Sequence, residues 1–167
     1  MNTQKEWWNA RFEGDKDGSV IMGAENWSEF KVLLEKLLDD KKCKVLDLGC
    51  GIGSISHKLS ELGFDVTAID FSEIAISELK SRSPHIRALV HDMTETLPFG
   101  DGSFDLTIAN LTLHYFNKKQ TQEIISEIKR VLKPKGILIG AVISIEEYEM
   151  VKHRLEFVEI EASNSLK

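Results

Sequence analysis

The chain has 167 residues, of which 42% are hydrophobic and 29% charged, and this composition fits one folded domain and excludes a disordered chain. It carries 21 basic and 27 acidic residues, a net charge of -6, so we expect no nucleic-acid partner. The absence of an apolar run of about 20 residues, and of a secretory signal, favours a cytoplasmic location without membrane attachment. Two cysteines without a C-x-x-C pair predict no disulfide framework and no metal site.

Short apolar strands and amphipathic helices alternate through the first half of the chain. The run KVLDLG is apolar and ends in glycine, which is typical of a buried strand. Ser28 and Ser72 are suited to cap the helices that follow them, and Gly63 and Pro84 are suited to end helices. The predicted elements are a helix at 28–39, a strand at 44–48, a helix from 54 to 63, a strand at 65–70 and a helix at 72–82.

The same alternation continues in the second half. Asn117 is suited to cap the clearest helix, whose apolar stripe includes Ile124 and Val131. Such alternation with short connections forms crossover units on a parallel sheet. We therefore expect one α/β domain over 1–167, with its core at 28–145 and a doubly wound, mostly parallel sheet with helices on both faces. The predicted elements are strands at 86–92 and 104–111, a helix at 118–133 and a strand at 137–145.

A glycine-rich loop, DLGCGIG, follows the first predicted strand, where a parallel sheet places its ligand site. Glycines let the backbone approach a ligand, and the helix that follows presents free N–H groups to it. The third glycine comes one residue earlier than in the G-x-G-x-x-G fingerprint of dinucleotide sites. The acidic residue before the loop suits an ammonium group better than a pyrophosphate, so we expect a ligand with a positive amine. The candidate contact residues are Asp47, Gly49, Cys50, Gly51 and Gly53.

Acidic residues also end the next two predicted strands. Asp70 ends the second, where a carboxylate can accept hydrogen bonds from both hydroxyls of a ribose; the alternative is that it only caps the next helix. Phe71 follows and is placed to lie against a purine. Asp92 ends the third strand and suits an exocyclic amine, and Met93 after it suits the ring. With the glycine loop, these residues predict a site for an adenosine that has a cationic, amine-bearing tail.

These residues also carry a family resemblance. VLDLGCGIG, followed by Asp70, Asp92, LPFGDGSFDL and VLKPKG, resembles the class I S-adenosylmethionine-dependent methyltransferases over about residues 28–145. The resemblance implies a Rossmann-like fold and S-adenosylmethionine as cofactor, with S-adenosylhomocysteine as its product. It implies that the glycine loop wraps the methionine part and that Asp47 lies near its amino group. It further implies that Asp70 holds the ribose and that Asp92 and Met93 hold the adenine.

Methyl transfer from an activated sulfonium mainly requires that nucleophile, methyl and sulfur be held in line. An acid–base group is needed only where the nucleophile must lose a proton, so we predict no catalytic residue. The resemblance implies that Asn110 faces the methyl-transfer region. His114 and Tyr115 are the best-placed candidates to contact substrate, and the alternative that they pack against the next helix stays open. We expect His57 on the surface and see no partner for His85.

The N-terminal segment 1–27 places aromatic residues among polar ones. Trp7, Trp8 and Phe12 fit an apolar lid over the cofactor, with both tryptophans as candidate substrate contacts. The alternatives are that these aromatics pack beneath a surface segment, or that the segment is mobile without ligand. The start of the chain loosely resembles small-molecule methyltransferases, so a small-molecule methyl acceptor is expected.

The C-terminal residues depart from the family pattern, in which two further strands follow the fifth. Residues 146–167 are expected to form a helix of about three turns and then a tail. The C-terminal strands are therefore expected to be missing or shortened. An open edge at the fifth strand favours a homodimer through that edge.

Three functional hypotheses follow from the sequence. The first is an S-adenosylmethionine-dependent methyltransferase that acts on a small molecule. The second, motivated by the missing strands, is a catalytically silent domain that binds the cofactor or a partner chain. The third is a nucleotide-dependent oxidoreductase, which the early third glycine and Asp47 disfavour.

Overall fold

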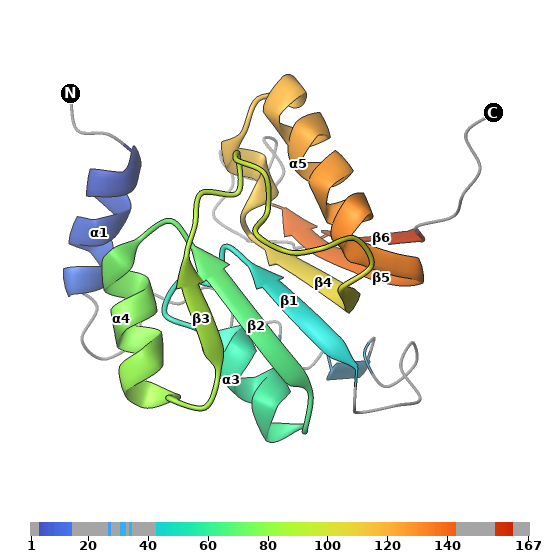
Figure 1. The fold of residues 1–167 in the computed structure, drawn as a ribbon. Coiled ribbons are helices and arrows are strands. Elements are labelled where there is room, and N and C mark those ends of the chain that lie inside the picture. Colours follow the sequence, from blue (N-terminus) through green and yellow to red (C-terminus); the bar gives the residue numbers. More distant parts are fainter. Residues whose placement is uncertain are drawn as a thin grey trace.

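A computed structural model of the chain describes residues 4–14, 27, 31, 32, 34, 43–142 and 156–161, the last of these by their backbone alone. Figure 1 shows a twisted sheet with helices packed along it. Within the helix predicted at 28–39, the described residues 31, 32 and 34 are helical. The elements are α1 (Gln4–Gly14), β1 (Lys44–Leu48), α3 (Ser54–Glu61), β2 (Asp65–Asp70), α4 (Glu73–Arg82), β3 (Arg87–Val90), β4 (Phe104–Asn110), the 3-10 helix η1 (Leu113–Tyr115), α5 (Lys118–Val131), β5 (Leu132–Val142) and β6 (Glu156–Glu161).

The strands form one six-stranded sheet in the order β3-β2-β1-β4-β5-β6 (Figure 1). Strands β1 to β5 run parallel, and β6 runs antiparallel to β5. The chain proceeds from β1 toward one edge and then from β4 toward the other, so the strand order reverses between these two neighbours. Ligand sites of such sheets lie beyond the carboxyl ends of the strands, beside this reversal. The predicted doubly wound, mostly parallel sheet is confirmed.

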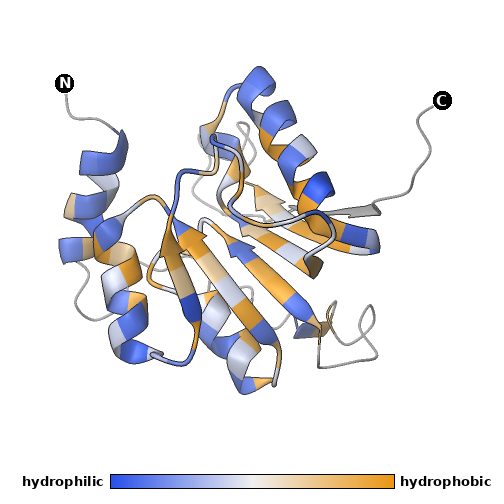
Figure 2. Cartoon of the chain, in the orientation of Figure 1, coloured by the Kyte–Doolittle hydropathy of each residue, from blue (hydrophilic) through white to orange (hydrophobic). Residues whose placement is uncertain are grey.

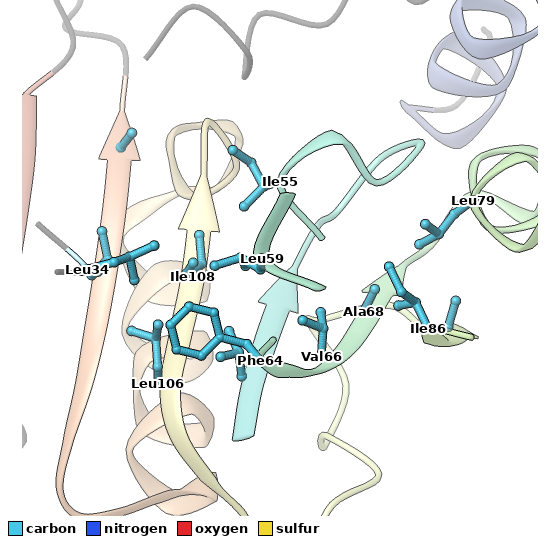
Figure 3. Close-up of a cluster of buried hydrophobic side chains, with 14 of the residues drawn as sticks. Leu34, Ile55, Leu59, Phe64, Val66, Ala68, Leu79, Ile86, Leu106 and Ile108 are labelled. Carbon is cyan, nitrogen blue, oxygen red and sulfur yellow. The ribbon is translucent and has the colours of Figure 1, made fainter. Parts of the chain in front are cut away.

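Two clusters of buried hydrophobic side chains show that helices cover both faces of the sheet. One contains Leu59 of α3 and Leu79 of α4, both labelled in Figure 3, together with Val45 of β1. The other joins Ile128 of α5 to Leu46 of β1. Val45 and Leu46 belong to different clusters because successive side chains of a strand point to opposite faces. Figure 2 shows the result, with hydrophobic strands at the centre and hydrophilic residues along the outer sides of the helices.

Two of the predicted helix caps are confirmed. The Ser72 hydroxyl accepts a hydrogen bond from the Ala75 amide (3.1 Å) at the start of α4. Asn117 and Gln120 form a reciprocal capping box at the start of α5, with distances of 3.0 and 3.2 Å. Helix α3 has no side-chain cap and begins directly after Gly53 of the glycine loop. Its first N–H groups therefore lie where the sequence predicts a ligand.

The boundary between α5 and β5 differs from the prediction. The sequence predicts a helix through residue 133 and a strand from 137, but β5 begins at Leu132, directly after α5. Leu132 pairs with Phe104 of β4 before the regular ladder starts, and a register shift separates the two parts. Lys135 takes a left-handed φ of 66° in this irregular stretch. Pairing with β4 thus extends the strand across the K-P-K-G sequence, which local rules assign to a turn.

The C-terminal expectation also needs a correction. Residues 156–161, which the sequence assigns to a helix and tail, form β6 and pair with β5 from Ile137↔Glu161 to Val142↔Glu156. One antiparallel C-terminal strand is therefore present, and the edge of β5 is covered. This removes the argument for a homodimer through that edge. Residues 143–155, where most of the expected helix falls, lie outside the described residues.

Three further features concern the described residues. None of their helices is long and apolar enough to cross a membrane. No group of three or more histidine, cysteine, aspartate or glutamate side chains among them could hold a metal ion. Neither Cys43 nor Cys50 forms a disulfide with another described residue.

Candidate active site

The glycine loop after β1 is built from residues with left-handed backbone. Gly49, Gly51 and Gly53 have φ values of 74°, 53° and 85°. The amides of Gly49 and Cys50 donate to the Ile69 carbonyl of β2 at 2.9 and 3.0 Å, which ties the loop to the neighbouring strand. A Cβ at Gly49 would lie 2.5 Å from Thr112, and one at Gly53 would collide with Leu79. These two glycines are required by packing as well as by backbone conformation.

Gly51 differs because a Cβ there would meet one neighbour, the Phe12 ring, at 3.4 Å. The Cys50 thiol beside it donates to the Gly51 carbonyl (3.3 Å), and burial raises the thiol pKa well above its usual value. Gly51 is therefore the loop glycine that faces helix α1.

Asp47 is fully enclosed below the loop. It is 2% exposed, and one carboxylate oxygen accepts a hydrogen bond from the Ser56 hydroxyl of α3 at 2.5 Å. Burial is the main cause that raises the pKa of Asp47 to about 6, and the nearby charge of Asp70 adds to the effect. The structure thus joins this carboxylate to Ser56, a partner that the sequence analysis missed.

Asp70 connects the end of β2 to the glycine loop. Its Oδ2 accepts from the Gly51 amide and its Oδ1 from the Ser72 amide, both at 2.9 Å. Burial raises its pKa, and the hydrogen bonds from Ser72, Gly51 and Phe71 oppose that shift. The structure brings Asp70 and the glycine loop together as predicted. The hydrogen bond from the Gly51 amide has no part in capping α4, so Asp70 does more than cap that helix. Phe71 is half-buried beside it.

The end of β3 is more open. Asp92 is exposed, and its Oδ1 accepts from the amide and hydroxyl of Thr94, at 2.9 and 2.7 Å. Met93 is buried among the side chains beneath α5. A Cβ added at Gly49 would lie 3.0 Å from the Met93 Cε. His91 carries a buried Nε2 without a hydrogen-bond partner, which the sequence analysis did not single out.

The segment after β4 is held tightly against the glycine loop. The Thr112 hydroxyl is placed to donate to the carbonyl of Asn110 (2.9 Å) or Leu48 (3.3 Å). Leu111 between them has a φ of 51°, which is uncommon for a residue with a branched side chain. The Asn110 Oδ1 is buried and has no hydrogen-bond partner. Thr112 was missed from sequence because only the folded chain shows its contact with Gly49.

Helix η1 carries the two remaining candidates. The His114 Nδ1 is buried without a hydrogen-bond partner, and burial lowers the pKa of the imidazole below 6.5. Its ring lies 4.1 Å from the ring of Tyr115, centroid to centroid, and Tyr115 is 44% exposed. At neutral pH the imidazole is therefore uncharged.

Helix α1 lies beside α4 (Figure 1) and reaches both sides of this site. On the glycine-loop side, Phe12 faces Gly51, and the Asn9 side chain accepts from the Ser72 hydroxyl at 2.5 Å. Lys5 forms an ion pair with Glu73 at 3.2 Å. On the other side, Trp8 stacks on Phe12 and meets Tyr115 edge-on, each with ring centroids 5.4 Å apart. The outer ring, Trp7, contacts Trp8 at 4.9 Å.

Two described histidines away from the site, His57 and His85, have partners. His57 is exposed on α3, as expected, and its ring bonds to Ser83 (2.9 Å) and lies 3.5 Å from Glu61. His85 bonds to the Ser60 hydroxyl at 2.9 Å, which corrects the expectation that it has no partner.

These residues fit the adenosine-like ligand that the sequence predicts. A carboxylate, a glycine loop and the start of α3 converge at the carboxyl edge of the sheet beside the reversal of strand order. Three buried polar atoms at the ends of β3 and β4 and on η1 lack hydrogen-bond partners, and such groups are rare unless a ligand or water meets them. They are His91 Nε2, Asn110 Oδ1 and His114 Nδ1.

Comparisons with known proteins agree with this geometry. The methyltransferase domain family matches residues 45–136. A malonyl-[acyl-carrier protein] O-methyltransferase of Buchnera aphidicola is 39% identical over 113 residues, which cover 68% of this chain and 44% of that protein. A demethylmenaquinone methyltransferase of Beutenbergia cavernae is 39% identical over 98 residues, covering 59% of this chain and 40% of that protein.

Among solved structures, the PH0226 protein of Pyrococcus horikoshii superposes with a TM-score of 0.62 at 32% identity, covering 75% of this chain and 62% of that one. The chain spans about half the length of the curated relatives it matches. The family match nevertheless covers more than half of the chain and includes the glycine loop, Asp70 and Asp92. The chain therefore belongs to the methyltransferase domain family, within the class I S-adenosylmethionine-dependent methyltransferases.

Proposed function

We propose that this protein binds S-adenosylmethionine and transfers its methyl group to a small-molecule acceptor. The observation that carries the proposal is the buried Asp70 carboxylate, hydrogen-bonded to the Gly51 amide at the carboxyl edge of the sheet. This bond holds a carboxylate, which can accept hydrogen bonds from ligand hydroxyls, next to the glycine loop.

The bound cofactor supplies an electrophilic methyl group on a sulfonium, which a nucleophile can take without further activation. In this proposal the glycine loop holds the methionine part and Asp70 the ribose hydroxyls. Asp92, Met93 and Phe71 hold the adenine. Asn110 lies at the methyl-transfer side, and its unpartnered Oδ1 supports that role. Asp47 lies beneath the glycine loop and fixes the position of α3 through its hydrogen bond with Ser56.

The small size of the acceptor is supported by two observations. The acidic net charge of -6 disfavours a polyanionic acceptor. The Beutenbergia cavernae relative is named for demethylmenaquinone, and the Buchnera aphidicola relative for a malonyl group on a carrier protein. Neither name refers to a nucleic acid.

We also assign α1 as a cover over the site, in line with the lid expected at 1–27. Its contacts run from Ser72 and Gly51 on the cofactor side to Tyr115 on the acceptor side. Cofactor binding should therefore change the surroundings of Trp8. Titration with S-adenosylhomocysteine should change the tryptophan fluorescence of the protein and of Trp7→Phe, and Trp8→Phe should lose most of the change. An equal response in both variants would contradict the assignment.

The decisive experiment is calorimetric titration with S-adenosylmethionine and S-adenosylhomocysteine, with NAD as the control ligand. We expect Asp70→Asn to weaken binding by about ten-fold or more, because an amide oxygen replaces a charged acceptor. Asp65→Asn is the matched control, since Asp65 is exposed at the opposite end of β2. Tighter binding of NAD would favour the oxidoreductase, and binding without transfer to any acceptor would favour the silent domain.

A further inference from the structure

Helix α1 contacts both of the residues whose amides hold the Asp70 side-chain oxygens. The Gly51 amide donates to one carboxylate oxygen and the Ser72 amide donates to the other, both at 2.9 Å. A Cβ added at Gly51 would lie 3.4 Å from the Phe12 ring of α1, and the Asn9 side chain of α1 accepts a hydrogen bond from the Ser72 hydroxyl. The helix is therefore connected to the carboxylate by two routes, one an apolar contact and the other a hydrogen bond.

The contacts of α1 with α4 and the glycine loop lie along one face of the helix, which Figure 1 shows beside α4. Lys5, Asn9 and Phe12 follow the i, i+4, i+7 spacing of a helical face. Lys5 pairs with Glu73, the first residue of α4, at 3.2 Å, and both side chains of this pair are exposed. Exposed ion pairs contribute little to stability, so the hydrogen bond from Ser72 to Asn9 is the more specific of the two polar contacts.

The Ser72 hydroxyl is fully buried and takes part in two hydrogen bonds. It accepts from the Ala75 amide at 3.1 Å and donates its single proton to Asn9. With α1 docked and the Asn9 acceptor removed, that buried proton would lose its partner, which is unfavourable. The two bonds hold the hydroxyl from opposite partners and thereby limit the rotation of Ser72. Because the amide that donates to Asp70 belongs to the same residue, Asn9 also restricts the position of that amide.

The Asp70 carboxylate depends on these amides more than an exposed carboxylate would. It is buried, and burial raises its pKa and so disfavours the charged form, whereas the hydrogen bonds from the Ser72, Gly51 and Phe71 amides favour it. The charged form is the stronger acceptor for a ligand hydroxyl, and such bonds weaken steeply when their geometry is poor. A displaced Ser72 amide would therefore weaken the carboxylate as an acceptor and change its orientation.

We infer that Asn9 is a positioning residue, which fixes Ser72 and thereby holds the Asp70 carboxylate in the orientation that accepts the ribose hydroxyls of the cofactor. This inference rests on the proposed function and names the residue through which α1 acts on the cofactor site. Asn9 does not itself touch the ligand. The docking of α1 and the recognition of the ribose are coupled through the Ser72 hydroxyl and amide, so each favours the other.

The test compares S-adenosylhomocysteine with its 2′,3′-dideoxy analogue, which lacks both ribose hydroxyls. The ratio of the two dissociation constants, measured by calorimetry, reports how well the protein recognises the hydroxyls. We expect the natural protein to bind S-adenosylhomocysteine at least about ten-fold more tightly than the analogue, because the acceptor is charged. Asn9→Leu has a similar volume but no acceptor, and it should reduce this ratio by about five-fold. Asn9→Asp keeps an acceptor oxygen for the Ser72 hydroxyl and should restore the ratio.

Lys5→Met is the matched control, because it breaks a contact on the same face of α1 without changing the partner of Ser72. Weaker docking of α1 alone should change the affinities for both ligands alike, so this variant should keep the ratio of the natural protein. If Asn9→Leu also keeps that ratio, Asn9 serves only the docking of α1. That result would overturn the inference and leave the proposed function intact.

A double-mutant cycle tests the route through Ser72. Ser72→Ala lacks the hydroxyl, so adding Asn9→Leu to it should change the ratio no further, whereas a further five-fold loss would show another route and overturn the inference. If Ser72→Ala does not fold, the Asn9 variants decide alone. Equal binding of both ligands by the natural protein would overturn the inference while cofactor binding stands. If the natural protein binds neither ligand, the inference falls together with the proposed function.

Discussion

Gly49 lies so close to Thr112 that any side chain would clash, and this gives a test of the loop at the scale of one residue. In Gly49→Ala the new Cβ would lie 2.5 Å from the Thr112 methyl, and the residue would keep a φ of 74°. We expect a loss of about 3 kcal/mol in the free energy of unfolding, from left-handed strain and overpacking together. Urea unfolding measures it, and adding Thr112→Ser should recover part of the loss by removing that methyl.

Gly63→Ala is the matched control for this substitution. Gly63 has a φ of 94°, and nothing lies within 4 Å of its virtual Cβ. It isolates the backbone strain, for which we expect about 1 kcal/mol. Equal losses at Gly49 and Gly63 would show that the contact with Thr112 is not tight.

Asp47 predicts a pH dependence of stability. Its folded pKa is about 6, above the ordinary 3.8, so the folded state binds the proton more tightly than the unfolded chain. The stability that this group contributes is fully present below pH 3.8 and is lost as pH rises through 6. In Asp47→Asn that loss disappears, so the free energy of unfolding of the variant should rise relative to that of the natural protein by about 2 kcal/mol between pH 4 and pH 7.

The measurement is denaturant unfolding of both proteins across this pH range. The pKa of Asp70 is raised as well, so Asp70 also contributes to the pH dependence of stability. Only the difference in free energy of unfolding between the natural protein and Asp47→Asn therefore isolates the contribution of Asp47. Asp65→Asn, at the exposed start of β2, serves as the control. A difference that stays constant between pH 4 and pH 7 would refute the burial argument.

At the scale of elements, Arg130 of α5 fastens the long connection between β3 and β4. Its guanidinium donates to the carbonyls of Leu97 (3.0 Å) and Phe99 (2.8 Å) and to the carboxylates of Asp101 and Glu127. Glu127 in turn accepts from the Leu97 amide at 2.9 Å. The side chain is 27% exposed, so these bonds are partly shielded from water.

We expect Arg130→Ala to lower the free energy of unfolding by about 2 kcal/mol, because the loop carbonyls lose charge-assisted donors. Arg130→Lys should recover little, since one ammonium cannot reproduce the planar fork of the guanidinium. Lys129→Ala, on the exposed side of the same helix, is the control and should change stability by less than about 0.5 kcal/mol. Full recovery by lysine would mean that charge alone holds the connection.

The docking of α1 shows what an element's own sequence does not reveal. Its contacts with the rest of the molecule alternate between aromatic and polar residues: Lys5, Trp8, Asn9 and Phe12. These positions follow helical spacing, but a mixed face has no apolar stripe to mark it as a packing surface. The sequence therefore names the aromatic residues of α1 but not the partners that hold them.

For the whole molecule, the sequence predicted the features that depend on local chemistry. The strands, the caps at Ser72 and Asn117, and the meeting of Asp70 with the glycine loop all follow from short patterns read at the carboxyl ends of strands. The contacts of Asp47 with Ser56 and of Gly49 with Thr112 join segments that only the folded sheet brings together. For the same reason the sequence missed β6, because its pairing with β5 is a long-range property.

The pairing of β6 with β5 leads to a prediction about the state of the whole molecule. An uncovered β5 would present a row of unpaired backbone groups from Ile137 to Val142, and such edges associate with other chains. A chain shortened to end at residue 155 should therefore self-associate more strongly and unfold at lower denaturant concentration than the full chain. Sedimentation velocity over a range of protein concentrations measures the association. A double substitution of Val158 and Ile160 by proline, which removes two backbone donors from β6, should act in the same direction, because Val158 and Ile160 pair with Gly140 and Leu138. If both altered chains sediment like the full chain at every concentration, β6 does not protect this edge in solution.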